Sequence, residues 1–132
     1  MVTGKARKVL IVDDAPWVSD TLAVIFSTSG FEARAAHTAE QALEIAENWE
    51  PALAIIDVIL PSMNGVDLAI SFTHSRPSCR ILLFSGQSNA AEIVEKAAER
   101  GFRFELLSKP IHPNVMLSRA TRMLSLWRSP DL

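Results

Sequence analysis

The sequence predicts an open, doubly wound α/β domain in which five parallel strands alternate with five helices. Short apolar runs alternate along the chain with longer amphipathic stretches. The runs start about two dozen residues apart, which leaves room for a strand, a helix and the return to the sheet. Most runs are apolar on consecutive residues, as expected for parallel strands that are buried on both faces. The length of 132 residues fits one such domain.

The expected strands are the apolar runs themselves. Four of them are clear, and a weaker one follows Gly30. Right-handed crossovers between them give an open sheet with helices on both faces. In chain order the runs are Val9–Val12, Phe31–Ala36, Ala52–Leu60 around Asp57, Ile81–Phe84 and Phe104–Leu107.

Between the runs, apolar residues recur with the period of a helix. A third helix over Val66–Phe72 is assigned mainly from its position between two strands. The other four apolar faces are Val18, Leu22, Ile25 and Phe26; Ala39, Ala42, Leu43 and Ala46; Ala90, Ile93, Val94, Ala97 and Ala98; and Met116, Ala120, Met123, Leu124 and Trp127.

Helix ends carry signals of their own. Thr38, followed three residues later by Gln41, predicts a capping box, and Asn89 is expected to cap the fourth helix. Gly30 and Gly101 stand where a helix ends in a left-handed residue before the next strand. The two tryptophans at helix ends, Trp17 and Trp49, are expected to pack against the domain; the alternative for Trp17, which is next to the acidic residues, is that it shapes access for a partner.

Composition excludes several classes of protein. The net charge of −2, from 13 Lys+Arg and 15 Asp+Glu, does not indicate a nucleic-acid partner. The single cysteine, Cys79, cannot form an internal disulfide. No apolar run approaches the roughly 18 residues of a membrane span, and the N-terminus lacks the features of a signal peptide. We therefore expect a soluble, cytoplasmic protein with no membrane partner.

Polar side chains stand where the expected strands end. Asp13 and Asp14 follow the first strand, Asp57 ends the apolar part of the third, Ser85 closes the fourth and Lys109 follows the fifth. In doubly wound folds the functional site lies at this edge of the sheet. Three clustered carboxylates repel one another unless a cation is present, and oxygen ligands suit Mg²⁺. A carboxylate beside a cation, an ammonium and a hydroxyl is what phosphoryl transfer to Asp needs.

The chain resembles the receiver domain of two-component response regulators from Lys8 to about Trp127. Four motifs in the right order carry the resemblance: KVLIVDDA, IIDVILPSMNG, LLFSG and LLSKP. The expected sheet is flavodoxin-like with strand order 2-1-3-4-5, and the expected receiver domain spans residues 8–128 between short tails at 1–7 and 129–132.

The resemblance implies a role for each site residue. Asp57 is the phosphoacceptor, which takes a phosphoryl group from the phosphohistidine of a histidine kinase. Lys109 pairs with the phosphoryl group and precedes a cis bond to Pro110. Ser85 supplies the hydroxyl that shifts toward the phosphoryl group when the domain switches.

The resemblance also implies a magnesium site. Asp14 and Asp57 are direct ligands, Asp13 acts through water, and Ile59 contributes its backbone carbonyl. Ile59 and Gln87 flank the path of the hydrolytic water in this family. Because the apolar Ile59 side chain cannot orient water, we expect slow self-dephosphorylation.

One position departs from the family. Receivers usually carry Tyr or Phe three residues before the lysine, but Leu106 stands there and the chain contains no Tyr. Phosphorylation should survive, since the ring touches neither metal nor phosphate, whereas the route of the signal to the surface is open. The alternative function is a receiver-like interaction module that works without phosphorylation. A hydrolase is disfavoured, because Ile59 occupies the place of the second Asp that such enzymes use.

The expected protein is a signalling switch and not an enzyme. Its partners are a sensor histidine kinase or phosphotransfer protein and a downstream protein. The downstream partner is expected at the fourth helix, fifth strand and fifth helix, roughly Ala90–Trp127, and homodimerisation is open. No output domain is expected after Ser129-Pro130; a free-standing regulator and a receiver from a longer chain both fit.

Overall fold

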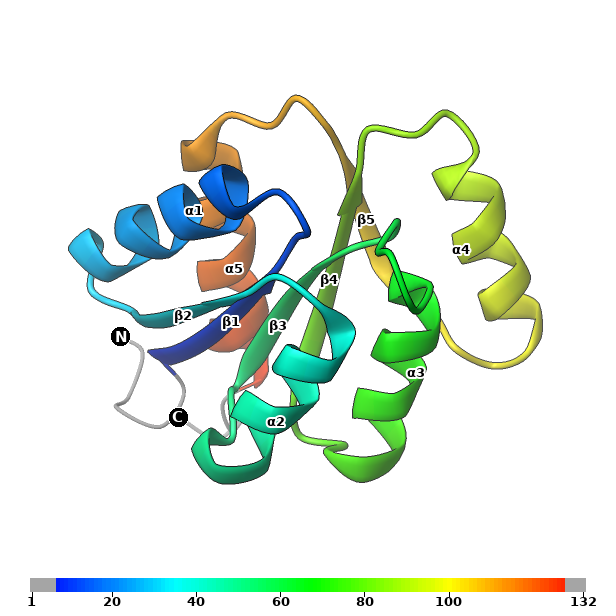
Figure 1. Cartoon of the computed structure of the whole chain (residues 1–132), viewed down its shortest axis with the longest axis horizontal. Helices are drawn as coiled ribbons and strands as arrows, with labels where there is room; N and C mark the ends of the chain where they lie inside the picture. Colours follow the sequence, from blue (N-terminus) through cyan, green and yellow to red (C-terminus); the bar gives the residue numbers. More distant parts are fainter. Residues whose placement is uncertain (1–6, 128–132) are drawn as a thin grey trace.

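The computed structural model describes residues 7–127, in which five parallel strands form one sheet between two layers of helices (Figure 1). The strand order is β2-β1-β3-β4-β5, so the predicted class and order are confirmed. The strands are β1 (Lys8–Val12), β2 (Glu32–Ala36), β3 (Leu53–Asp57), β4 (Arg80–Ser85) and β5 (Glu105–Ser108). The helices are α1 (Pro16–Thr28), α2 (Ala39–Trp49), α3 (Gly65–Ser75), α4 (Ala90–Glu99) and α5 (Pro113–Trp127).

The predicted domain limits depend on residues at the two ends of the chain. The proposed tails and the Ser129-Pro130 terminator lie almost wholly outside the described residues, so the limits 8–128 stay a prediction. Within residues 7–127, no helix has both the length and the hydropathy needed to cross a bilayer.

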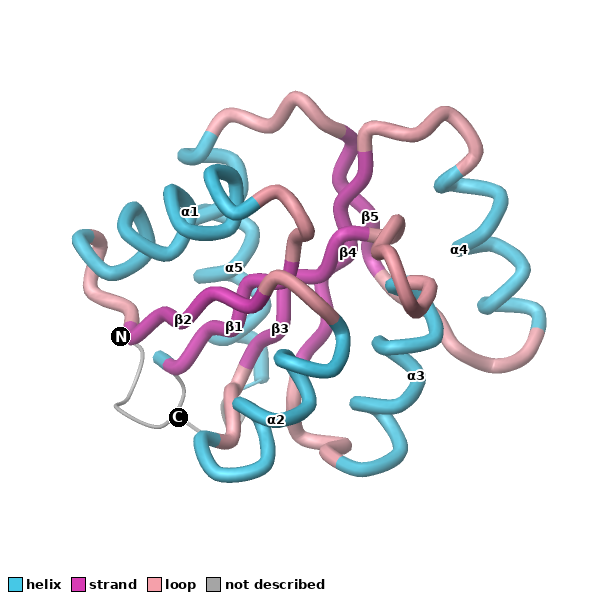
Figure 2. The backbone as a smooth tube through the Cα atoms, in the orientation of Figure 1, coloured by secondary structure: helices cyan, strands magenta, loops and turns pink. Residues whose placement is uncertain are grey.

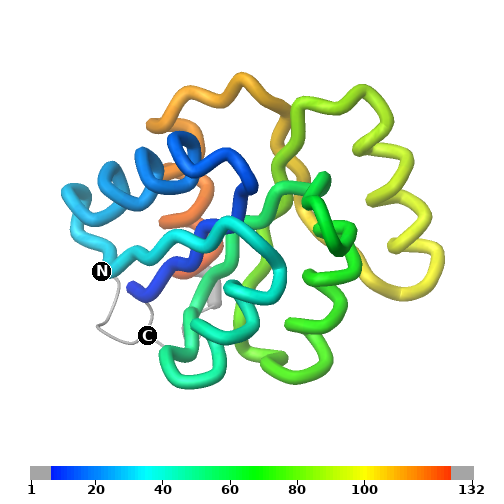
Figure 3. The backbone as a smooth tube through the Cα atoms, viewed as in Figure 1, coloured from blue at the N-terminus to red at the C-terminus, as the bar shows by residue number. Residues whose placement is uncertain are grey.

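Two hydrophobic cores lie on the two faces of the sheet. Helices α1 and α5 cover one face, and α2, α3 and α4 cover the other (Figure 2). Because side chains alternate along a strand, Val9 and Ile11 of β1 pack toward α1 and α5, while Leu10 and Val12 pack toward the other layer. The central strand β3 is buried along its whole length. Although α1 and α5 come from opposite ends of the chain, they contact each other (Figure 3).

The helix ends agree with the predicted signals at most positions. The backbone N–H of Gln41 donates to Thr38 Oγ1 at 3.0 Å, and Gln41 Oε1 accepts from the N–H of His37, one residue earlier than in a standard capping box. Gly30 and Gly101 have φ values of +98° and +94°, as expected for left-handed helix ends. Asn89 stands at the N-cap position of α4, but the prediction that its side chain caps the helix is wrong.

The two tryptophans have different environments. Trp49 is buried and donates its indole N–H to Glu32 Oε2 at 3.2 Å. The guanidinium carbon of Arg34 lies 4.7 Å from the centroid of the Trp49 ring. The predicted packing of Trp49 is therefore confirmed. Trp17 is 75% exposed at the start of α1, so the prediction that it packs is wrong. Trp17 is the second residue of α1, which begins at Pro16 directly after the loop that leaves β1.

Candidate functional site

The carboxyl ends of the strands bring the predicted site residues to one edge of the sheet. Val12, at the end of β1, is the register partner of Ile56 in β3, so Asp13 and Asp57 follow at the same level. Ser85, the last residue of β4, pairs with Ser108, the last residue of β5. Lys109 is the next residue, and its N–H donates to the Ser85 carbonyl at 2.8 Å. The parallel register therefore gathers residues that are far apart in the chain.

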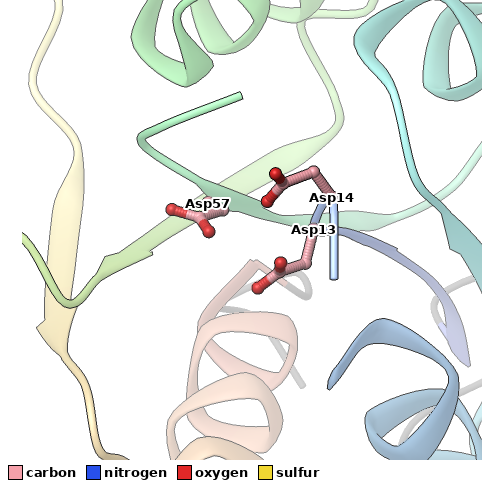
Figure 4. Close-up of side chains that lie close together, drawn as sticks. All are labelled: Asp13, Asp14 and Asp57. Carbon is pink, nitrogen blue, oxygen red and sulfur yellow. The ribbon is translucent and has the colours of Figure 1, made fainter. Parts of the chain in front are cut away.

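Three carboxylates lie together at this edge. One oxygen from each of Asp13, Asp14 and Asp57 lies within 4.8 Å of the other two, and Figure 4 shows the three side chains at the ends of β1 and β3. Asp13 and Asp57 are buried, with 1% and 6% of their surface exposed, whereas Asp14 is exposed. We call these three residues the acidic cluster.

Each buried carboxylate uses one oxygen locally and the other toward Lys109. Asp13 Oδ1 accepts from the N–H of Ala15 at 2.9 Å, and Asp57 Oδ1 accepts from the N–H of Ile59 at 3.0 Å. These bonds across two residues fix both side chains against their own turns. Lys109 Nζ then donates to Asp13 Oδ2 at 2.8 Å and to Asp57 Oδ2 at 3.0 Å. The ammonium group thus bridges the two buried carboxylates.

Burial and charge act in opposite directions on these groups. Burial raises the pKa of the Asp57 carboxyl above its ordinary value, and the hydrogen bonds from Ile59 and Lys109 reduce this rise without cancelling it. For Lys109, burial alone would lower the pKa, but hydrogen bonds and attraction from Asp13 and Asp57 outweigh it, so the pKa is raised. Lys109 therefore stays charged at neutral pH, while Asp57 ionises at a cost that an added cation would reduce.

A single glycine allows α3 to start against the end of β3. A Cβ atom on Gly65 would clash with the Asp57 carbonyl oxygen and lie 2.8 Å from Val58 Cα. The Gly65 N–H donates to the Val58 carbonyl at 2.7 Å. Asn64 caps α3, because its Oδ1 accepts from the N–H of Val66 at 2.7 Å. The sequence interpretation did not assign this cap, although an Asn directly before a helix is a recognisable signal.

Ser85 is buried at the end of β4, and its hydroxyl oxygen accepts from the N–H of Gln87 at 3.0 Å. A Cβ atom on the intervening Gly86 would lie 3.6 Å from Lys109 Cβ, an ordinary contact distance.

Leu106 is partly buried and packs against the core between the sheet and helices α2 to α4. The Lys109–Pro110 peptide bond is cis.

The donor set of the acidic cluster fits a hard divalent cation. Carboxylate oxygens are the ligands that Mg²⁺ prefers, and Mg²⁺ keeps several waters when it binds to proteins. The exposed Asp14 leaves one side of the cluster open to solvent, so waters and a phosphate oxygen could complete a coordination shell. The Ile59 carbonyl as a further ligand stays a prediction.

The fold and the site define an α/β domain with an acidic cluster and a lysine at the carboxyl edge of a 2-1-3-4-5 sheet. Residues 9–121 match the family model of the response regulator receiver domain. The chain belongs to this family, as its sequence motifs predicted.

Individual relatives agree with the family assignment. The chain is 30% identical to the chemotaxis protein CheY of Thermotoga maritima, over 82% of this chain and 89% of that protein. It is 32% identical to the DNA-binding transcriptional regulator NtrC of Azospirillum brasilense, over 91% of this chain but 24% of that protein. The crystal structure of a CheY-like receiver domain protein from Methanospirillum hungatei superposes with a TM-score of 0.83 at 26% identity, covering 92% of this chain and 95% of that one. The chain therefore spans less than a third of the length of NtrC and most of CheY.

Proposed function

We propose that this receiver domain accepts a phosphoryl group on Asp57 in a Mg²⁺-dependent reaction. The observation that carries the proposal is the acidic cluster, in which Asp57 lies within 4.8 Å of two further carboxylates and 3.0 Å from the Lys109 ammonium. The donor is a phosphohistidine on a sensor histidine kinase or a phosphotransfer protein. Asp57 Oδ1 stays bound to the Ile59 N–H, while Oδ2 forms the bond to phosphorus and the histidine nitrogen leaves.

The other residues neutralise charge as the bond forms. Mg²⁺, when bound, supplies positive charge at the oxygens of the phosphoryl group. Asp14 and Asp57 would hold the ion directly and Asp13 through a water, together with the Ile59 carbonyl. Lys109 donates to a phosphoryl oxygen from the position that it already occupies. The hydroxyl of Ser85 can donate a further hydrogen bond, because in this structure it accepts one from Gln87 and its proton is available.

Incubation with Mg²⁺ and acetyl phosphate, followed by mass spectrometry of the intact protein, tests the proposal. We expect the wild-type protein to gain the mass of one phosphoryl group, and we expect EDTA to abolish the gain. Asp57→Asn should prevent it. Asp67→Asn, at an exposed aspartate on α3, is the matched control and should leave it unchanged. A gain that persists in Asp57→Asn would contradict the assignment of the acceptor.

We propose that the domain is cytoplasmic and that phosphorylation at Asp57 makes it a switch that meets a downstream protein, and not an enzyme acting on a separate substrate. The proposed contact surface comprises α4, β5 and α5. Leu106 of β5 packs against the core that also contains residues of α4, so a change at β5 would be felt by the core that lies under α4. Binding of partners from a lysate to the phosphorylated and untreated forms, and sedimentation of both forms, would show whether modification changes partner binding or produces a homodimer.

Leu106 also favours a second candidate function, an interaction module that works without phosphorylation. The side chain lacks the ring whose rotation normally accompanies switching in this family. If the phosphorylated and untreated forms bind every partner equally, this second function is the correct one.

A further inference from the structure

Phe84 lies in contact with the ammonium group of Lys109. Lys109 Nζ is over the Phe84 ring, 4.6 Å from its centroid, which is within the range of a cation–π interaction. The same Nζ donates to Asp13 and Asp57. The Phe84 side chain is 1% exposed and belongs to the core between the sheet and helices α1 and α5. The ammonium group therefore contacts an aromatic ring as well as two carboxylates.

The strand register holds the Phe84 ring in a fixed place relative to Asp57, the proposed phosphoacceptor. Phe84 is the register partner of Asp57 on one side and of Leu107 on the other. Its carbonyl accepts from the N–H of Val58 at 3.0 Å. A residue hydrogen-bonded on β4, between two neighbouring strands, moves little compared with a loop residue. The Lys109 side chain, by contrast, leaves the end of β5 and carries the large rotamer freedom of a lysine.

We propose that Phe84 is a positioning residue, whose ring holds the Lys109 ammonium beside the Asp57 carboxylate so that it can meet the incoming phosphoryl group. This inference rests on the proposed function. An ammonium group has three N–H donors, and two of them are used by Asp13 and Asp57. The ring restricts the Lys109 side chain to this conformation, so the third N–H donor starts from a defined position. The side chain therefore loses less conformational freedom when it binds the phosphoryl oxygen.

At position 84, an aromatic ring and an aliphatic side chain of similar size would differ in their effect on the Lys109 ammonium. Either could fill the core, but only the ring presents a negative π face to the cation. A cavity of about 420 Å³ adjoins this position, lined by Phe84, Lys109, Trp17, Ile111 and other residues. Tyrosine keeps the aromatic ring and adds only a hydroxyl, at a residue that borders this space. Phe84→Tyr is therefore the conservative variant, and Phe84→Leu removes the ring.

Two readouts test the proposal. The first is the NMR chemical shift of the Lys109 side-chain methylene protons in the unphosphorylated protein, which a ring below them moves upfield. We expect this shift in wild type and Phe84→Tyr and its loss in Phe84→Leu. The second is the rate of Asp57 phosphorylation by acetyl phosphate with Mg²⁺. We expect Phe84→Leu to be roughly threefold to tenfold slower, and Phe84→Tyr to restore most of the rate.

A matched control separates positioning from loss of core packing. Phe26 is fully buried in the same core, and its ring packs against Phe31. Phe26→Leu should lower the stability to urea but leave the phosphorylation rate of the folded protein near wild type. Site-specific mono-, di- and trifluorophenylalanine at position 84 keep the ring while weakening its negative face, so the rate should fall stepwise.

The outcomes distinguish this inference from the proposed function. If wild type is phosphorylated and folded Phe84→Leu reacts at the same rate, or if fluorination has no effect, the positioning role is wrong and the proposed function stands. If wild type is not phosphorylated, the proposed function is wrong and with it the role of Phe84 in that reaction. An unshifted Lys109 signal in wild type contradicts the contact itself, whatever the rate.

Discussion

Lys109 Nζ lies 2.8 Å from the buried carboxylate of Asp13, a residue 96 positions earlier in the chain. The contact connects the loop after β5 with the loop after β1, although β3 and β4 lie between these two strands in the sheet. Since Nζ also donates to Asp57 Oδ2, the Lys109 ammonium already offsets the negative charge of two of the three clustered carboxylates. A metal would therefore join an ordered site and would not have to assemble it.

Replacing Lys109 by methionine tests how much this compensation contributes to stability. Lys109→Met keeps the unbranched stem of the side chain, one atom shorter, but leaves two buried carboxylates without their cation. We expect the free energy of unfolding in EDTA to fall by about 1–3 kcal/mol, and we expect Mg²⁺ to recover part of the loss. Urea unfolding with and without Mg²⁺ measures both effects. Lys96→Met, at an exposed position on α4, is the control; equal losses in the two variants would contradict the prediction.

The raised pKa of Asp57 predicts a pH dependence of stability. Because burial raises this pKa, the folded state binds the proton more tightly than the unfolded state does. The resulting stability is present below the ordinary aspartate value of 3.8 and is lost as the pH rises through the raised pKa. At neutral pH without divalent cations, Asp57→Asn should therefore be more stable than wild type. This difference should shrink as the pH falls toward the ordinary value.

Urea unfolding of wild type and Asp57→Asn across this pH range measures the difference. Titration of Lys109 does not contribute to this difference. The pKa of Lys109 is raised, so the side chain stays charged in the folded and the unfolded state near neutral pH. A variant that is less stable than wild type at neutral pH would show that attraction to Lys109 outweighs the cost of burying the carboxylate.

Gly65 and Gly86 differ in the space around them, and alanine at each position should show it. Gly65→Ala would press a methyl group against the Asp57 carbonyl, so we expect a loss of about 1–3 kcal/mol in the free energy of unfolding. At Gly86 the methyl group would meet only the Lys109 stem at an ordinary distance, and the effect should stay within about 0.5 kcal/mol or be stabilising. Chemical denaturation of Gly65→Ala and Gly86→Ala measures the two changes in the free energy of unfolding. Equal effects would mean that the start of α3 moves away from β3 at little cost.

The fold was predictable because its signals are local and periodic. Consecutive apolar residues mark the central strand β3, and Gly30 and Gly101 follow helices in the left-handed conformation that glycine adopts readily. The site residues were predictable for a related reason: in a parallel sheet, the strand ends share one edge, so Asp13 and Asp57 must approach each other.

The details that escaped prediction depend on backbone angles and on neighbours far away in the chain. Asn64 and Asn89 both precede a helix, but Asn64 has the extended ψ of 135° that turns its side chain toward the free N–H groups, whereas Asn89 has ψ near 6°. Phe84 was visible in the LLFSG motif, yet nothing near it in the sequence indicates that Lys109 approaches its ring. Contacts between residues of different elements become apparent only after the sheet is assembled.

We expect the Ile59 side chain to prolong the lifetime of the phosphorylated state. The Ile59 side chain is 40% exposed at the rim of the acidic cluster, and its backbone N–H binds Asp57 Oδ1. An apolar side chain at this position offers no hydrogen bond to a water approaching the phosphoryl group. We therefore expect slow loss of the phosphoryl group from wild type and faster loss from Ile59→Asn, whose amide can orient that water. The decay is measured by intact mass after removal of acetyl phosphate. Ile59→Val, which keeps the side chain apolar, should decay like wild type; an unchanged decay in Ile59→Asn would show that Ile59 does not limit hydrolysis.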